Sequence, residues 1–284
     1  MLFRSHYAGF ATDEDSIFDL YTIGTIITFS QITSGRETKK PYPNFKRELN
    51  EAIERGATHY TALECTKGTN GAQTTYALNS SVSMTFLYQK FYEQVASNEN
   101  NHSVCTLFTQ GDNNFLFTGD LEKEGETSLA ELNNLPQCKL YKAGHHGSKT
   151  SSHNVLLDEI RPEIVCVCCC AGNAEYTDVK ENMFPTQEFV DRISKHTDKV
   201  YVTSLGYVVV KEYTTDKDGN PITLWKNEKD GEGNDKFASF NGNIIVTSNK
   251  KGVTVKCSNN DTLLKDTEWF RNNREMPDSW KNAA

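Results

Sequence analysis

The sequence predicts an α/β protein, because short apolar stretches of strand length alternate along the chain with segments of helical periodicity. Residues 23–29 (IGTIITF) form an uncharged apolar run of strand length. Residues 42–55 follow with apolar side chains three or four positions apart, as in an amphipathic helix. A second strand at residues 58–65 completes a strand–helix–strand order, which is typical of layered α/β arrangements.

The predicted helix at residues 42–55 has an apolar face and a stop signal. Four of its apolar side chains recur at helical spacing on that face: Phe45, Leu49, Ala52 and Ile53. Gly56 follows directly and is expected to end the helix, since glycine is the usual residue after a helix C-terminus. We therefore expect all four side chains to pack against the neighbouring strands.

The middle of the chain continues the same alternation. Residues 81–88 alternate as a half-buried strand, and residues 92–101 are polar and loop-like. Residues 103–109 and 114–117 flank a Gly-Asp pair, which predicts a hairpin. The further predicted elements are a helix at 121–132, a short apolar segment at 138–141, a helix at 151–160, a strand at 164–170 after Pro162, a helix at 185–196 with Phe189, Val190 and Ile193 inward, and a strand at 199–203.

The last part of the chain is predicted to consist of antiparallel hairpins followed by a helical segment. Residues 206–256 carry turn chemistry at Asp218–Asn220 and at Asn241–Gly242. Residues 262–280 are amphipathic and predict a terminal helix.

Composition limits the classes of function. The chain has 284 residues and a formal net charge of −8, so its bulk charge gives no general affinity for a nucleic-acid backbone. No apolar run reaches the roughly 18 residues of a membrane span, so none is expected. No G-x-S-x-G turn and no Walker-type phosphate loop occurs, which disfavours a serine hydrolase and a P-loop enzyme.

Cysteine usage predicts a reducing compartment. Four of the eight cysteines lie in residues 164–170 (IVCVCCC), where neighbouring strand residues point to opposite faces and cannot all pair. We interpret them as reduced thiols in a buried strand, with a metal cluster as the alternative. The expected location is the cytoplasm.

Two motifs carry the candidate chemistry. Phe115–Asp120 (FLFTGD) is an apolar run that ends in a Thr-Gly-Asp turn, and Cys138–Tyr141 is a second apolar segment that leads into Lys142–Ser148 (KAGHHGS). Both polar groups would project from strand ends, where a rigid sheet can aim an acid and an imidazole at one point. An aspartate oxygen and a histidine nitrogen that converge there suit a divalent ion such as zinc or manganese.

Each candidate residue also has a structural alternative. Asp120 could cap a helix that begins at Leu121. His145 and His146 are adjacent and cannot easily both ligate one ion, so one would ligate and the other would orient or contact substrate; the ligand is taken as His145. The alternative for both is a polar turn held by hydrogen bonds. His102 is a candidate ligand or an ordinary loop histidine.

The segment after the histidine pair suits an anion or a helix cap. Ser148, Lys149 and Thr150 precede the helix predicted at 151–160, and exposed amides there would suit a phosphate oxygen. Ser151 or Ser152 could instead serve as an ordinary N-cap.

Taken in order, these residues resemble a known family. Gly119-Asp120, Gly144–Ser151 (GHHGSKTS), the strand after Pro162, the Pro185-led helix and the following strand are similar to metallo-β-lactamase-fold hydrolases, and most similar to the hydrolase domain of ComEC-type DNA-uptake competence proteins. The resemblance covers about residues 17–256. It implies a four-layer αββα sandwich with metal bound at one edge between two sheets, and hydrolysis by a metal-activated water. Phosphodiesters, lactams, lactones and thioesters are substrates across the family.

The resemblance assigns roles to individual residues. It implies a hydrolase domain at residues 1–256, a helical tail at 257–284, and zinc or manganese as the cofactor. The implied roles are metal ligation by Asp120, His145 and His102, catalysis by Asp120 and His146, and substrate binding by Ser148, Lys149 and Thr150. The substrate would be a small molecule or a nucleic acid.

The chain also departs from the family pattern. The early H-x-H-x-D-H motif has no counterpart, since His6 stands alone. Phe184 stands before Pro185, where relatives of the competence type often have histidine. We therefore expect an N-terminally incomplete sandwich with weak or absent metal binding and no activity in this shortened chain. The alternative function is a non-catalytic binding or regulatory module that keeps the fold without metals.

Overall fold

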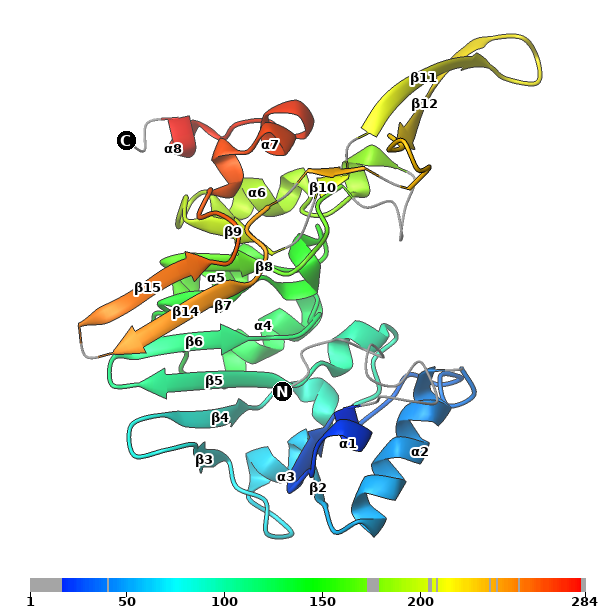
Figure 1. Cartoon of the computed structure of the whole chain (residues 1–284). Helices are drawn as coiled ribbons and strands as arrows, with labels where there is room; N and C mark the ends of the chain where they lie inside the picture. Colours follow the sequence, from blue (N-terminus) through cyan, green and yellow to red (C-terminus); the bar gives the residue numbers. More distant parts are fainter. Residues whose placement is uncertain are drawn as a thin grey trace. The chain divides into compact units, whose positions relative to one another are not determined.

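The computed structural model confirms the α/β class, with helices and strands alternating along the chain (Figure 1). It describes the following residues: 17–39, 41–172, 179–203, 206–207, 209–234, 236–238, 240–249 and 251–281. His6 lies outside them. The chain divides into two compact units, one of residues 1–145 and 150–163, the other of residues 146–149 and 164–284. The four-layer arrangement and the domain boundary after residue 256 stay predictions.

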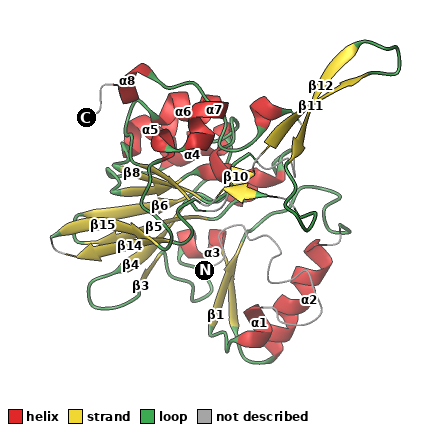
Figure 2. Ribbon diagram, turned by 45° about the horizontal axis from the view of Figure 1, so that its top comes forward, coloured by secondary structure: helices red, strands yellow, loops and turns green. Residues whose placement is uncertain are grey.

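The first unit opens with the predicted strand–helix–strand order. Strand β1 (Thr25–Thr28) pairs in parallel with β2 (Thr58–Thr61), and helix α2 (Pro41–Glu54) connects them. Figure 2 shows α2 and the short helix α1 (Ile17–Leu20) beside β1. The register joins Thr25 to Thr58 through to Thr28 with Thr61.

Helix α2 buries a narrower stripe than predicted. Leu49 and Ala52 are buried in a cluster with Phe18, Ile26 and Ala57, and Phe45 packs against that cluster. Ile53, by contrast, is 40% exposed, so its predicted burial was wrong. Its position lies at the edge of the stripe formed by residues 45, 49 and 52, where the helix surface turns toward solvent.

The predicted strand at 58–65 is shorter, because a capping box begins a helix inside it. Helix α3 (Ala62–Lys67) starts after Thr61, whose hydroxyl accepts from the backbone N–H of Glu64 at 3.3 Å. The Glu64 carboxylate accepts in return from the backbone N–H of Thr61 at 2.7 Å. Gly68 ends the helix at φ 61°. A Thr-x-x-Glu pattern was the sequence signal for this start.

The main sheet of the first unit has the strand order β3-β4-β5-β6-β7 (Figure 1). These strands are β3 (Thr75–Ala77), β4 (Ser83–Leu87), β5 (Cys105–Gln110), β6 (Asn113–Phe117) and β7 (Leu140–Lys142). The first four pair antiparallel, which confirms the predicted hairpin of β5 and β6, whereas β7 runs parallel to β6. Two 3₁₀ turns, η1 (Lys90–Tyr92) and η2 (Glu99–His102), occupy the segment that joins β4 to β5.

Helix α4 (Lys123–Leu132) connects β6 to β7, and a 3₁₀ turn, η3 (Gly144–Gly147), then leads toward helix α5 (Asn154–Ile160). Both predicted helices are confirmed. The N-terminus of α5 is capped from a distance by Glu126 of α4, which is fully buried. Its carboxylate accepts from the backbone N–H groups of Ser152 at 2.5 Å and His153 at 2.9 Å, and from His153 Nδ1 at 2.8 Å. The predicted cap by Ser151 or Ser152 was wrong, since the N-cap residue is His153, with no side-chain cap bond.

The second unit contains a parallel strand pair with a helix between its strands. Strands β8 (Ile164–Val167) and β9 (Val200–Val202) pair in parallel, and they are joined by the 3₁₀ turn η4 (Lys180–Asn182) and helix α6 (Gln187–Ile193). Three α6 side chains are fully buried, as predicted: Phe189, Val190 and Ile193.

The cysteine-rich segment is only partly a strand. Strand β8 ends at Val167, so Cys166 lies within it and is buried, whereas Cys168, Cys169 and Cys170 follow it and are half-buried. The prediction that all four lie in one buried strand was wrong. The next residues, Ala171 and Gly172, form a turn.

The C-terminal part of the second unit contains the predicted hairpins. Its strand pairs are β10 (Gly206–Tyr207) with β13 (Phe237–Ala238), β11 (Val209–Thr215) with β12 (Pro221–Asn227), and β14 (Ile244–Asn249) with β15 (Gly252–Cys257). The turn at Asp218–Asn220 is confirmed, with Asp216 accepting from the N–H groups of Asp218 and Asn220. Asn241 does not turn a hairpin; it is buried, and its amide donates to the carbonyls of Asn260 and Thr262.

The chain ends in short helices instead of the single predicted one. These are a 3₁₀ turn, η5 (Leu264–Asp266), and the helices α7 (Glu268–Asn273) and α8 (Asp278–Lys281). Pro277 precedes α8 and interrupts the helical path. Phe270 and Trp280 are buried all the same. Among the described residues, none of the helices has the length and apolar character needed to cross a bilayer.

The buried cap predicts a clear effect of Glu126→Gln on stability. The variant replaces one of the two carboxylate oxygens that accept from three donors before α5 with an NH₂ group, which cannot accept. We therefore expect a loss of about 1–3 kcal/mol in the free energy of unfolding. Urea unfolding followed by circular dichroism measures it. Glu131→Gln, on the exposed side of the same helix, is the control and should stay within about 0.5 kcal/mol of the parent chain. Equal effects of the two substitutions would contradict the capping role.

Candidate functional site

Asp120 follows β6 in a turn whose shape requires glycine. Gly119 has φ 60°, and a Cβ at this position would approach Ser103 Oγ to 2.8 Å. The same hydroxyl accepts from the backbone N–H of Asp120 at 3.0 Å, and the Asp120 side chain is buried. Asp120 does not cap the following helix, because the N-cap of α4 is Glu122. The capping alternative for Asp120 was therefore wrong.

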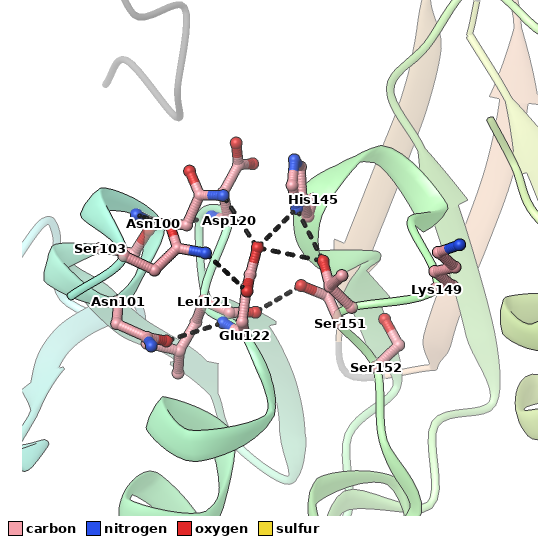
Figure 3. Close-up of polar contacts among 12 residues, drawn as sticks. Asn100, Asn101, Ser103, Asp120, Leu121, Glu122, His145, Lys149, Ser151 and Ser152 are labelled. Carbon is pink, nitrogen blue, oxygen red and sulfur yellow. Dashed lines mark hydrogen bonds and ion pairs between the residues drawn. The ribbon is translucent and has the colours of Figure 1, made fainter. Parts of the chain in front are cut away.

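The structure brings His145 to the Thr-Gly-Asp turn. The backbone N–H of His145 donates to the carbonyl of Gly119 at 3.2 Å, so the two turns are joined next to Asp120. His145 adopts a left-handed conformation with φ 45°, which is uncommon outside glycine. Figure 3 shows the Asp120 and His145 side chains near Glu122, which lies between their two turns.

Glu122 is the centre of a polar network around this point (Figure 3). Its Oε1 accepts from Asn100 Nδ2 at 3.0 Å and from Thr150 Oγ1 at 3.1 Å. Its Oε2 accepts from Asn98 Nδ2 at 2.8 Å. His145 Nδ1 lies 3.4 Å from Oε1. A single carboxylate thus connects the β4–β5 segment, the Asp120 turn and the histidine turn.

The contacts of His145 indicate its tautomer. The Thr150 hydroxyl donates its hydrogen to Glu122, so it can only accept from His145 Nδ1, 3.1 Å away. Nδ1 therefore carries a proton, and in the neutral ring the lone pair belongs to Nε2. In a histidine that ligates a metal or acts as a base, a carboxylate usually accepts from one ring nitrogen, and the other ring nitrogen binds the metal or takes the proton.

The surroundings of Glu122 favour its charged form. Burial by itself would raise the pKa of this carboxyl, but hydrogen bonds from His145, Asn100 and Thr150 outweigh burial and hold the pKa below its usual value. The positive charge that His145 can carry acts in the same direction. Glu122 therefore remains an acceptor at neutral pH and keeps His145 in place.

His146 belongs to the second unit and is held there by a backbone carbonyl. Its Nδ1 donates to the carbonyl of Cys168, which again leaves the lone pair of the neutral ring on Nε2. Its ring stacks on Phe184, with centroids 6.1 Å apart and planes inclined by 20°. Like its neighbour, His146 is left-handed, with φ 57°. The two adjacent rings are thus fixed by different partners.

The predicted substrate-binding residues fall into different surroundings. Thr150 is part of the Glu122 network in the first unit. Ser148 and Lys149 belong to the second unit, where Ser148 is buried and Lys149 Nζ donates to Asn182 Oδ1 at 2.6 Å. Their predicted contact with a substrate stays a prediction.

His102 has the contacts of a structural histidine. It is buried, and its Nε2 accepts from the backbone N–H of Ala96 at 3.2 Å. Its Nδ1 donates to the carbonyl of Phe91 at 3.2 Å. Both ring nitrogens thus hold backbone groups in this conformation, and metal ligation by His102 stays a prediction.

Sequence reasoning missed Glu122 and the asparagines that support it. In the sequence, Glu122 is one of several acids at the start of the predicted helix 121–132, where negative charge is ordinary. Asn98 and Asn100 fell in a polar loop without periodicity. A signal did exist, since an acid two residues after a Thr-Gly-Asp turn must lie near that turn, but its partners are distant in sequence.

The described residues do not by themselves complete a metal centre. In the described ranges, no group of three or more His, Cys, Asp or Glu side chains is placed to hold one ion. Asp120 and His145 offer two suitable donors, whereas catalytic zinc sites use three protein ligands and a water. Zinc or manganese as a cofactor therefore stays a prediction.

Comparison with known proteins agrees with the resemblance only in part. No protein-family model matches the chain. It is 29% identical over 119 residues to Recombination protein 2 of Haemophilus influenzae, a match that covers 42% of this chain and 14% of that protein. It is 27% identical over 119 residues to ComE operon protein 3 of Bacillus subtilis, covering 41% of this chain and 14% of the relative. The matched part is thus a small fraction of either relative, and the chain is similar to one segment of each of these two proteins.

Proposed function

We propose that this chain is a hydrolase-type module of a DNA-uptake system and that it acts on phosphodiester bonds. Support comes from the similarity to one segment of Recombination protein 2 and of ComE operon protein 3. It comes equally from the Thr-Gly-Asp and His-His-Gly turns, which are the polar ends of neighbouring strands β6 and β7.

One observation carries the proposal: the half-buried carboxylate of Glu122 holds His145 through Nδ1 beside Asp120. The lone pair on Nε2 can take a proton from an attacking water, and Glu122 stabilises the imidazolium that forms. The Asp120 carboxylate can only accept hydrogen bonds when ionised, so it would orient that water. The catalytic role that the resemblance implies for His146 stays a prediction.

A second candidate function is a non-catalytic DNA-binding module. It is favoured by the donor set, since the described residues contain no cluster of three metal-ligating side chains. The Thr-Gly-Asp and His-His-Gly turns would then stabilise the fold only, and DNA binding would depend on neither Asp120 nor His145. The two candidates differ in one measurable property, which is cleavage.

The decisive measurement is cleavage of a fluorescent single-stranded DNA oligonucleotide, with manganese or zinc in excess and with a chelator. The sequence by itself led us to expect no activity in this chain, but because Glu122 holds His145 beside Asp120, we now expect cleavage by the parent chain when metal is supplied in excess. Asp120→Asn and His145→Asn should each lower the rate by about a hundredfold or more, because they remove the acceptor and the base. Asparagine at position 145 tolerates the left-handed backbone, so the fold should survive.

Asp112→Asn is the matched control, because Asp112 is exposed in the turn between β5 and β6, away from the Glu122 network. It should cleave as fast as the parent chain. If the parent chain leaves DNA intact under every condition yet retains binding in fluorescence anisotropy, the hydrolase proposal fails and the binding module replaces it.

The depressed pKa of Glu122 predicts a pH-dependent contribution to stability. A carboxyl whose pKa is lower in the folded than in the unfolded chain stabilises the fold above its unfolded pKa. That contribution is lost as the pH falls through the folded pKa. Glu122→Gln should therefore lower the free energy of unfolding by about 1–3 kcal/mol at neutral pH, and the deficit should shrink in acid.

Urea unfolding at neutral pH and at a series of acidic pH values measures this difference. Glu124→Gln, an exposed acid of the same helix, serves as the control and should show little change at either end of the series. A deficit for Glu122→Gln that is constant across the series would contradict the charged network.

A further inference from the structure

Three consecutive cysteines stand directly after strand β8 in an irregular segment. Cys168, Cys169 and Cys170 are half-buried cysteines outside any disulfide, whereas Cys166 within the strand is buried. Their backbone is anchored to one neighbouring residue: the N–H of Thr203 donates to the carbonyl of Val167 at 3.0 Å, and its hydroxyl lies 3.5 Å from the carbonyl of Cys169. The segment therefore offers adjacent thiols that reagents can reach.

The remaining cysteines of the same chain provide a contrast. Burial raises the pKa of the Cys105 and Cys138 thiols to about 12, and it also raises the pKa of Cys166. Since the thiolate is the reactive form, these buried thiols are poor nucleophiles at neutral pH. Among the described cysteines, the partly exposed run at 168–170 is thus the best placed for thiol chemistry.

The peptide group between Cys168 and Cys169 also forms a hydrogen bond with His146. Its carbonyl oxygen accepts the hydrogen bond from His146 Nδ1. The ring of His146 also stacks on Phe184. The same peptide group would be part of the small ring that a disulfide between Cys168 and Cys169 closes. Any rotation of this peptide moves the oxygen that fixes the tautomer and orientation of His146.

Ring closure at adjacent residues must disturb that peptide. Cα atoms of neighbouring residues lie about 3.8 Å apart across a trans peptide. Disulfides normally join Cα atoms about 4.4–6.8 Å apart, so closure requires the backbone to rearrange. Strained disulfides are also the more easily reduced ones, which makes such a bond reversible under cellular thiol conditions.

We propose that Cys168 and Cys169 form a reversible thiol-modification site that takes low-molecular-weight disulfides and, by closing a vicinal disulfide, releases His146 from the Cys168 carbonyl. One thiolate attacks the small disulfide, and a mixed disulfide forms as the first small thiol leaves. The second cysteine then attacks the protein sulfur of that mixed bond and displaces the second small thiol. The two cysteines are oxidised, and one disulfide molecule is reduced to two thiols.

The experiment treats the full chain with oxidised glutathione, quenches with an alkylating reagent and maps the peptides by mass spectrometry. We expect a product lighter by two hydrogen atoms, with Cys168 and Cys169 joined, protected from alkylation and restored by dithiothreitol. Cys169→Ser should abolish this product, whereas Cys170→Ser keeps both partners and should form it as the parent does. Because the map of the parent chain alone identifies the bond, the result stands even if a variant folds poorly.

A second readout follows His146 itself by long-range ¹H–¹⁵N NMR of the histidine rings. Oxidation should shift the His146 signals in the parent chain and in Cys170→Ser, but not in Cys169→Ser. A stable glutathione adduct, a bond between Cys169 and Cys170, or a closed ring with unchanged His146 signals would each overturn the proposal. None of these readouts uses DNA cleavage, so the inference can fail or stand independently of the hydrolase proposal.

Discussion

The parallel pairing of β6 with β7 is the constraint on which the candidate site depends. The register joins Phe115 to Leu140 and Phe117 to Lys142, so both strands end at the same edge of the sheet. Each strand is followed within three residues by a turn that carries a polar side chain, Asp120 in one and His145 in the other. The hydrogen bond from His145 N–H to the Gly119 carbonyl then joins these turns directly.

Two carboxylates near the start of α4, half-buried Glu122 and fully buried Glu126, hold the residues of the first unit that follow β7. Glu122 accepts from Thr150 and lies against His145, and Glu126 accepts from the backbone of Ser152 and His153. One helix turn thus organises both the histidine and the N-terminus of α5. Because a carboxylate shielded from water needs several donors to stay charged, these acids make the positions of His145 and of residues 150–153 specific as well as stable.

Hydrogen bonds also stabilise the unusual backbone of the two turns. Gly119, His145 and His146 all have positive φ, and Gly119 also leaves no room for a side chain against Ser103. For histidine such a conformation costs free energy, which the surrounding hydrogen bonds must offset. His145 has the Gly119 carbonyl and Thr150 for this purpose, and His146 has the Cys168 carbonyl. Unusual backbone therefore coincides with the residues proposed to carry chemistry.

The sequence by itself determined the α/β class, most element types and the two polar turns, because these depend on local periodicity and on short turn motifs. It did not reveal that Glu122 is the centre of the site, that Glu126 caps α5, or that β8 ends before Cys168. Those features depend on partners brought together by the β6–α4–β7 crossover, and no local pattern encodes a partner that distant. Tertiary structure alone decided which acid meets which histidine, since a carboxylate withdrawn from water keeps its charge only where folding supplies its donors.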